Sequence, residues 1–282
     1  MQTVTDDGVT LHWESHGPED GTEDGTADPI LFVHEFGGDH RSWAPQVEHF
    51  SRTCRCLTYD ARGYPPSGVP DDPAAYSQDR AVADALAVLD AAGEPAAHVV
   101  GNSMGGFATL HIGLRHPDRA RSLVVAGCGY GAMPEDDAAF RTESRALAGR
   151  YRDEGAAAVA ADYGAGPGRL YLRDKDPDAY AEHLRILAEH DPAGAGLTML
   201  GVQASRPSLY DLTRELAAMR VPTLIVAGDH DGSVPDVGLM LLRTLPDAGL
   251  AVLPRSGHLT NLEEPELFAT LVERFHTRVG EV

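Results

Sequence analysis

The sequence has almost no lysine. Lys175 is the only one among 282 residues, and arginine carries nearly all of the basic charge. This excludes a Schiff-base or phosphate-binding lysine except at one polar position, in the segment DKDPD. Basic residues are also few overall: 23 lysines and arginines against 43 aspartates and glutamates, for a formal net charge of −20. A chain this acidic repels phosphate backbones and anionic membranes. We therefore expect neither nucleic acid nor a membrane as a partner.

Cysteines and long apolar runs are also scarce. Cys54, Cys56 and Cys128 include no C-x-x-C pair, and we interpret them as small buried residues rather than metal ligands. No apolar run approaches the roughly 20 residues that span a bilayer. The segment MQTVTDDGVTLHWESHG lacks the basic end and apolar core of a secretory signal. We therefore expect a cytoplasmic protein that acts on a small molecule, and the sequence predicts nothing about its oligomeric state.

The sequence does contain a regular alternation of strand and helix patterns. Short runs rich in valine, leucine and isoleucine predict strands at GVTLHWES, PILFVH, RCLTYD, HVVG, SLVVAG, TLIVAGD and LAVLP. Helical patterns separate several of them, such as DRAVADALAVLDAAG and FATLHIGLRHP. This order predicts an α/β fold, with a mainly parallel sheet and helices on both of its faces.

The alternation stops between residues 128 and 213. Helical patterns such as DAAFRTESRALAGRYRDEG and PDAYAEHLRILAEH occur here without a clear strand. We predict a core formed by residues 1–127 and 214–282, with residues 128–213 inserted as a helical cap. Such a cap would lie over the carboxyl ends of the strands, where open α/β sheets bind their ligands.

The segment HVVGNSMGGF places Ser103 between a predicted strand and a predicted helix. A sharp strand-to-helix turn brings backbones close together, so small residues are needed two positions before and after its centre. Gly101 and Gly105 occupy those positions. The turn would present the Ser103 hydroxyl at the positive end of a helix, beside the amide of Met104. A flexible linker, the alternative, would not lie between a buried strand and a helix, so we predict Ser103 as a nucleophile.

A serine hydroxyl becomes nucleophilic when a base removes its proton, and the base needs an acid to orient it. His258 follows the last predicted strand, on a loop at the same edge of the sheet as Ser103. Two aspartates, Asp229 and Asp231, follow the strand before it. We predict Asp231 as the acid, because Asp229 directly follows the strand and suits a turn-stabilising role.

Five segments, taken in chain order, resemble the motifs of serine hydrolases that have the α/β-hydrolase fold and a helical cap. They are VHEFGGDHRSW, YDARGYPPSG, GNSMGG, GDHDGSVP and SGHLTNLEEPELF, and the resemblance covers essentially the whole chain. It implies an eight-stranded type of sheet and the order serine, aspartate, histidine for the catalytic residues. It also implies an oxyanion hole made by the backbone amides of Phe36 and Met104, and catalysis without a metal or a cofactor.

Two residues depart from the family pattern. Pro65 replaces the second glycine of D-x-R-G-x-G, which we interpret as loop variation. Glu35 follows His34, where the family usually has glycine. A carboxylate directed into an oxyanion hole would oppose the developing negative charge, so we predict that Glu35 turns away and pairs with Arg41, Arg62 or a backbone amide. The alternative is that Glu35 and its neighbour His34 are auxiliary acid–base groups for a specialised reaction.

The motifs leave the substrate open. We predict hydrolysis of a small carboxylic ester or lactone through an acyl-enzyme. The segment GNSMGG also resembles C–C bond hydrolases of dienoate or diketone-type substrates, in which Arg206 would be the cap arginine, and a thioesterase would use the same mechanism. A non-catalytic ligand receptor on this fold is a further alternative, which His258 in its full context disfavours. Pocket-lining candidates in the cap are Tyr130, Met133, Tyr163, Tyr171, Met199 and Leu200.

Overall fold

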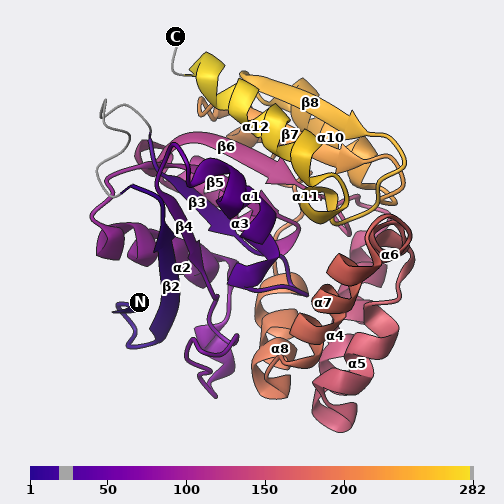
Figure 1. The fold of residues 1–282 in the computed structure, drawn as a ribbon. Helices are drawn as coiled ribbons and strands as arrows, with labels where there is room; N and C mark the ends of the chain where they lie inside the picture. The colour runs from indigo at the N-terminus through magenta and orange to yellow at the C-terminus, as the bar shows by residue number, and fades with distance from the viewer. Residues whose placement is uncertain (19–27, 280–282) are drawn as a thin grey trace.

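The computed structural model describes residues 1–18 and 28–279, and one sheet of eight strands lies at its centre (Figure 1). The strands follow the order β1-β2-β4-β3-β5-β6-β7-β8, in which β2 is antiparallel to β1 and β4 and all other neighbours are parallel. The mainly parallel sheet is as predicted, whereas the short edge strand β1 was not foreseen. The strands are β1 (Gln2–Val4), β2 (Thr10–His16), β3 (Ile30–Val33), β4 (Cys56–Tyr59), β5 (Ala97–Asn102), β6 (Ala120–Ala126), β7 (Thr223–Gly228) and β8 (Ala248–Leu253).

Helices cover both faces of the sheet because successive strand residues point to opposite sides. In β5, Val99 packs in one apolar cluster with α2, α3 and α10, and Val100 packs in a second cluster with α1 and α12. Burial on both faces explains why the central strands are continuous apolar runs. The elements are the 3₁₀ turn η1 (His40–Trp43) and the helices α1 (Ala44–Phe50), α2 (Gln78–Ala92), α3 (Met104–Arg115), α10 (Val234–Thr244), α11 (Thr260–Glu263) and α12 (Pro265–Val279).

The chain between β6 and β7 is helical. In Figure 1 helices α4 to α8 lie together on one side of the molecule, away from α12 and β8. A third apolar cluster, which includes Phe36, Met104 and Tyr151, joins these helices to the loop after β3 and to the start of α3. The elements are α4 (Asp137–Glu154), α5 (Ala156–Tyr163), the turn η4 (Pro167–Arg169), α6 (Leu170–Lys175), α7 (Pro177–Ala188), α8 (Pro192–Thr198), a π-helical turn (Met199–Gln203) and α9 (Thr213–Ala218).

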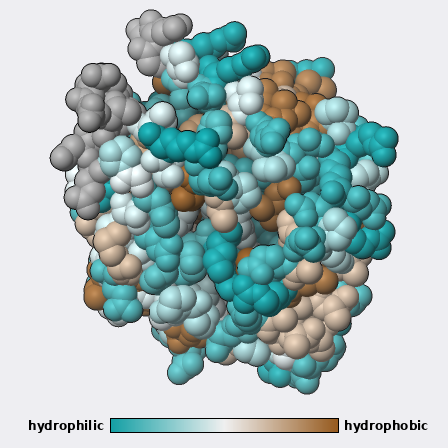
Figure 2. Space-filling model, in the orientation of Figure 1, coloured by the Kyte–Doolittle hydropathy of each residue, from teal (hydrophilic) through white to brown (hydrophobic). Residues whose placement is uncertain are grey.

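The surface is largely polar. The face drawn in Figure 2 is mostly hydrophilic, and hydrophobic residues appear on it in small separate groups. None of the helices that the structure describes is both long enough and apolar enough to cross a bilayer. All three cysteines are buried with free thiols, as expected for small core residues.

Candidate active site

The strand-to-helix turn between β5 and α3 holds Ser103 in a strained conformation. Its φ is +53° and its ψ is −116°, a region that residues with side chains rarely occupy. A Cβ on Gly101 would lie 2.3 Å from the carbonyl oxygen of Gly105, and a Cβ on Gly105 would lie 2.1 Å from that of Val33. Only glycine fits at these two positions, for the reason that the sequence pattern indicated.

Ser103, His258 and Asp231 form a continuous chain of hydrogen bonds. The Nε2 atom of His258 lies 2.8 Å from the Oγ atom of Ser103. On the other side of the ring, Nδ1 lies 2.9 Å and 2.8 Å from the two carboxylate oxygens of Asp231. Because a carboxylate only accepts, Nδ1 donates its proton to Asp231 and Nε2 is left to accept from the hydroxyl. The loops after β5, β7 and β8 thus bring together the three residues proposed from the sequence.

The charge of Asp231 affects the basicity of His258. Burial opposes the charged imidazolium, but the charge of Asp231 and its hydrogen bond outweigh burial and raise the pKa of His258 above its ordinary value. Arg169 acts in the opposite direction and lowers this pKa. Since only neutral His258 can accept a proton, its capacity as a base grows as the pH rises through this pKa.

Asp229, the alternative acid, lies at the surface just after β7. Its Oδ1 atom accepts the backbone N–H of Ser256 at 3.1 Å, and hydrogen bonds from backbone amides lower its pKa. The carboxylate of Asp229 therefore stabilises the turn beside β8, which is the role that the sequence suggested for it.

Three residues that the sequence analysis did not single out position the histidine loop. The backbone N–H of His258 donates to the carbonyl oxygen of Gly168 in η4 at 2.7 Å, and the Asn102 amide donates to the carbonyl oxygen of His258 at 3.3 Å. The carboxylate of Glu263 accepts the backbone N–H groups of Gly257 and Leu259 at 2.6 and 3.0 Å. Glu263 lies close enough to His258 in the sequence to have been considered, whereas nothing marked Gly168.

The backbone amides of Phe36 and Met104 are free to bind an anion. Met104 is the first residue of α3, so its N–H has no partner within the helix. Across the described parts of the chain, neither of these N–H groups has a hydrogen-bond acceptor. The Phe36 side chain packs edge to face on the rings of Tyr64 and Tyr151, which holds the loop in place.

Glu35 is buried, and its carboxylate binds groups of the protein. Its Oε2 atom accepts the backbone N–H of Gly37 at 2.7 Å and lies 3.6 Å from a guanidinium nitrogen of Arg169. A backbone amide was among the predicted partners. The prediction that Arg41 or Arg62 pairs with Glu35 was wrong. Arg41 pairs with Asp39 and Glu189, and Arg62 pairs with Asp7 and Asp84. Burial opposes the ionisation of Glu35, but Arg169 and the Gly37 amide help to outweigh it and lower the pKa of Glu35.

Both ring nitrogens of His34 serve the loop. Its Nδ1 atom lies 2.7 Å from the carbonyl oxygen of Glu35, and its Nε2 atom accepts the backbone N–H of Ala61 at 3.0 Å. An imidazole bonded in this way is fixed in one tautomer and has no free nitrogen for proton transfer. These contacts favour a structural role for His34 over the auxiliary role considered from the sequence.

Replacing Glu35 tests its role. We expect Glu35→Gln to change kcat by less than about tenfold, or about 1.4 kcal/mol of barrier. The free energy of unfolding should fall by about 3 kcal/mol, because Arg169 is left as a buried charge without its counter-ion. Urea unfolding and ester turnover measure the two effects. A variant that folds normally and loses a hundredfold in kcat would instead identify Glu35 as an acid–base group.

A cavity of about 580 Å³ lies between the helical segment and the loops that carry Ser103 and His258. Asp231 also lines it, and the helical segment contributes aromatic, apolar and arginine side chains. Three of the predicted lining residues do line it, namely Tyr130, Tyr163 and Met199. The other three lie elsewhere: Met133 packs against the core, Tyr171 lies against His230, and Leu200 is exposed.

Two buried arginines give this cavity a cationic side. The guanidinium of Arg206 lies 3.7 Å above the ring of Phe107 and donates to the carbonyl oxygen of Tyr130 at 2.5 Å. Burial lowers the pKa of Arg206 to about 10, so it remains charged at neutral pH. Arg169 lies 4.2 Å above the ring of Tyr163 and donates to its hydroxyl at 3.0 Å.

Comparisons with known proteins agree with this architecture. The family model described as alpha/beta hydrolase fold matches residues 28–265. RutD of Caulobacter segnis, a candidate carbamate hydrolase, is 32% identical over 273 residues, which are 95% of this chain and 96% of that protein. The 3-oxoadipate enol-lactonase 1 of Acinetobacter baylyi is 28% identical over 274 residues, 95% of this chain and 93% of that protein.

Solved structures also resemble nearly the whole chain. The crystal structure of an enol-lactonase from Burkholderia xenovorans superposes with a TM-score of 0.82 and 25% identity, and the match covers 98% of this chain and 100% of that one. These relatives are named hydrolases, which agrees with the expected class of reaction.

Proposed function

Because the chain belongs to the α/β-hydrolase fold family, we propose that it hydrolyses a small carboxylic ester or lactone through an acyl-enzyme on Ser103. The observation that carries the proposal is the chain of hydrogen bonds from Ser103 through His258 to Asp231, at the wall of a cavity. A hydroxyl, a base and an orienting carboxylate in this geometry are what acyl transfer requires.

The reaction proceeds in two steps. First, Nε2 of His258 takes the proton of Ser103 as Oγ bonds to the substrate carbonyl carbon. The resulting oxyanion accepts hydrogen bonds from the amides of Phe36 and Met104. The bond to the leaving oxygen then breaks, and His258 gives its proton to that oxygen. In the second step His258 deprotonates a water molecule that attacks the acyl carbon, which releases the acid and restores the hydroxyl of Ser103.

The cavity and the relatives support a small substrate. A volume of about 580 Å³ falls in the usual range for sites that enclose small molecules. An enol-lactonase is found both among the relatives by sequence and among the structural neighbours, which favours a lactone. A second candidate, cleavage of a C–C bond in a dienoate or diketone, is favoured by Arg206, because its guanidinium lines the same cavity as Ser103 and its charge suits the carboxylate of a dienoate.

A substrate panel distinguishes these reactions. The panel contains short p-nitrophenyl esters, five- and six-membered lactones, an enol-lactone, a thioester and a dienoate, each assayed for kcat/KM. We expect turnover of esters or lactones to exceed that of the dienoate, and a fluorophosphonate probe to label wild-type protein but not Ser103→Ala. Preferred cleavage of the dienoate would support the C–C hydrolase. Absence of both turnover and labelling would support a ligand receptor.

A further inference from the structure

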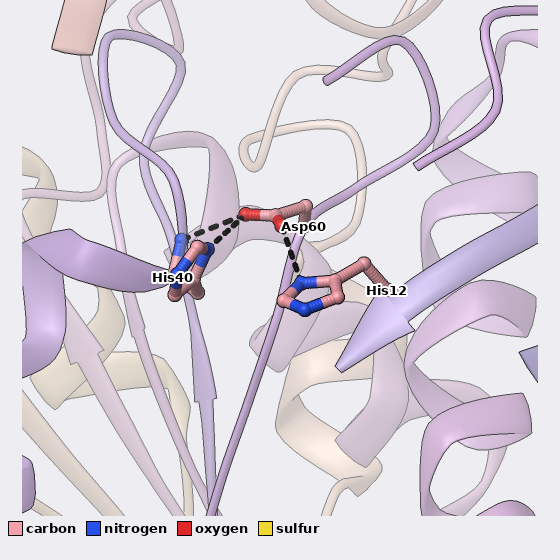
Figure 3. Close-up of side chains that lie close together, drawn as sticks. All are labelled: His12, His40 and Asp60. Carbon is pink, nitrogen blue, oxygen red and sulfur yellow. Dashed lines mark hydrogen bonds and ion pairs between the residues drawn. The ribbon is translucent and has the colours of Figure 1, made fainter. Parts of the chain in front are cut away.

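A second cluster of reactive side chains lies outside the cavity, on the sheet face of β2. Since alternate strand residues share a face, His12, Glu14 and His16 line up along one side of this strand. His40, at the start of η1, and Asp60, directly after β4, complete the cluster. Figure 3 shows Asp60 between the imidazole rings of His12 and His40. None of the five residues lines the cavity that contains Ser103.

Asp60 fixes the orientation of two imidazole rings. Its Oδ2 atom lies 2.8 Å from Nδ1 of His12, and its Oδ1 atom lies 2.8 Å from Nδ1 of His40 (Figure 3). Oδ1 also accepts the backbone N–H of His40 at 3.0 Å. The Asp60 carboxylate is completely buried and can only accept, so both Nδ1 atoms donate to it. In each neutral ring the Nε2 atom is then left with a bare lone pair.

Those two lone pairs face a second carboxylate. The Nε2 atoms of His12 and His40 lie 3.8 and 3.6 Å from the same oxygen of Glu14. The other oxygen of Glu14 lies 3.1 Å from Nε2 of His16. Two neutral nitrogens and an anionic oxygen repel one another unless a proton on one of the rings or a metal ion lies between them. The cluster thus has the electrostatics of a site that attracts a cation.

We propose that His12, Glu14 and His40 bind a divalent transition-metal ion, with zinc the best match, and that His16 or water provides the fourth ligand. Zinc binds nitrogen and oxygen ligands at about 2.0–2.1 Å in a tetrahedron, so its ligand atoms lie about 3.3 Å apart. The distances from the Glu14 oxygen to the Nε2 atoms of His12 and His40 exceed this by about 0.5 and 0.3 Å, and the centroids of the two imidazole rings lie 5.2 Å apart. A set of imidazoles and one carboxylate also suits zinc better than calcium or magnesium.

The contacts of Asp60 match the usual support for a metal site. Histidine ligands commonly donate their other ring nitrogen to a carboxylate, which fixes the tautomer and makes the ring a stronger ligand. Asp60 provides this support to both rings at once. The ion would join β2 to η1, and η1 follows the loop that contains Phe36. Its role would therefore be to stabilise the fold around that loop, and the reaction proposed for Ser103 does not use it.

Calorimetric titration with Zn²⁺ after chelator treatment tests the site. We expect the full chain to bind one ion saturably, and the thermal unfolding midpoint to rise by about 5 °C when zinc is well above its dissociation constant. His40→Gln and Glu14→Gln should each weaken binding by at least about tenfold. Glutamine at residue 40 can still donate to Asp60, and Glu14 does not contact Asp60, so circular dichroism should report folded variants.

His49→Gln is the matched control. His49 is a partly exposed histidine outside the cluster, and its Nε2 atom lies 3.9 Å from a carboxylate oxygen of Glu273. Its replacement should leave the zinc affinity and the thermal shift unchanged. Absence of saturable binding in the wild-type chain would overturn the proposal. Equal affinity in wild type, His40→Gln and Glu14→Gln would also overturn it, because the ion would then bind elsewhere.

Discussion

Ser103→Ala is expected to lower kcat/KM for an ester substrate by about 10⁴–10⁶-fold, the usual cost of losing a catalytic nucleophile. The fold should remain intact. Alanine keeps the Cβ atom, so the backbone at φ +53° carries the same strain as before. The lost Oγ atom bonds to the His258 ring, which remains bonded to Asp231, and the backbone N–H of His258 remains bonded to the carbonyl oxygen of Gly168. The thermal unfolding midpoint should therefore stay close to that of the wild type.

Ser144→Ala provides the control for this measurement. Ser144 is a buried serine of α4 that also lines the cavity, so its replacement changes the lining without removing the proposed nucleophile. We expect its kcat/KM to remain within about tenfold of the wild type. Purified Ser103→Ala that retained even a tenth of the wild-type activity would rule out Ser103 as the nucleophile.

Asp231→Asn is expected to lower kcat by about 10⁴-fold, whereas Asp229→Asn should change it only slightly. The asparagine amide can present an N–H to Nδ1 and so favour the wrong tautomer of His258. It also removes the charge that raises the pKa of His258. The residual activity of Asp231→Asn should therefore have its acidic limb at lower pH than the wild type, because the weaker base stays neutral to lower pH.

The two variants are compared through full pH–rate profiles and unfolding curves. Asp229 bonds to the backbone of Ser256, so Asp229→Asn should keep the wild-type acidic limb. If Asp229→Asn were the inactive variant and both unfolded alike, the acid would be Asp229. An unshifted acidic limb in Asp231→Asn would mean that a group other than His258 controls it.

Features that depend on residues close together in the chain could be predicted from the sequence. The alternation of apolar strands with helical patterns indicated the sheet and its two covered faces, because each pattern reflects the burial of a single element. The turn at Ser103 could be predicted for the same reason, since Gly101, Ser103 and Gly105 lie within one short segment. The preference for Asp231 over Asp229 followed from the position of each residue relative to the end of its strand.

Only the tertiary structure decided which distant side chains meet. Glu35 pairs with Arg169 instead of Arg41 or Arg62, because η4 of the helical segment folds back over the loop after β3. Half of the predicted lining residues do not line the cavity, since helical spacing says nothing about which side of a packed helix faces a ligand.

The cluster proposed to bind a metal ion has the same origin. The alternation of His12, Glu14 and His16 on one strand is visible in the sequence. By itself it shows only that these three side chains share one face of the strand. The cluster forms because β4 pairs with β2 and places Asp60 beside it, while η1 brings in His40. The residues of a strand determine which of its side chains share a face, and the packing of the whole chain determines what that face meets.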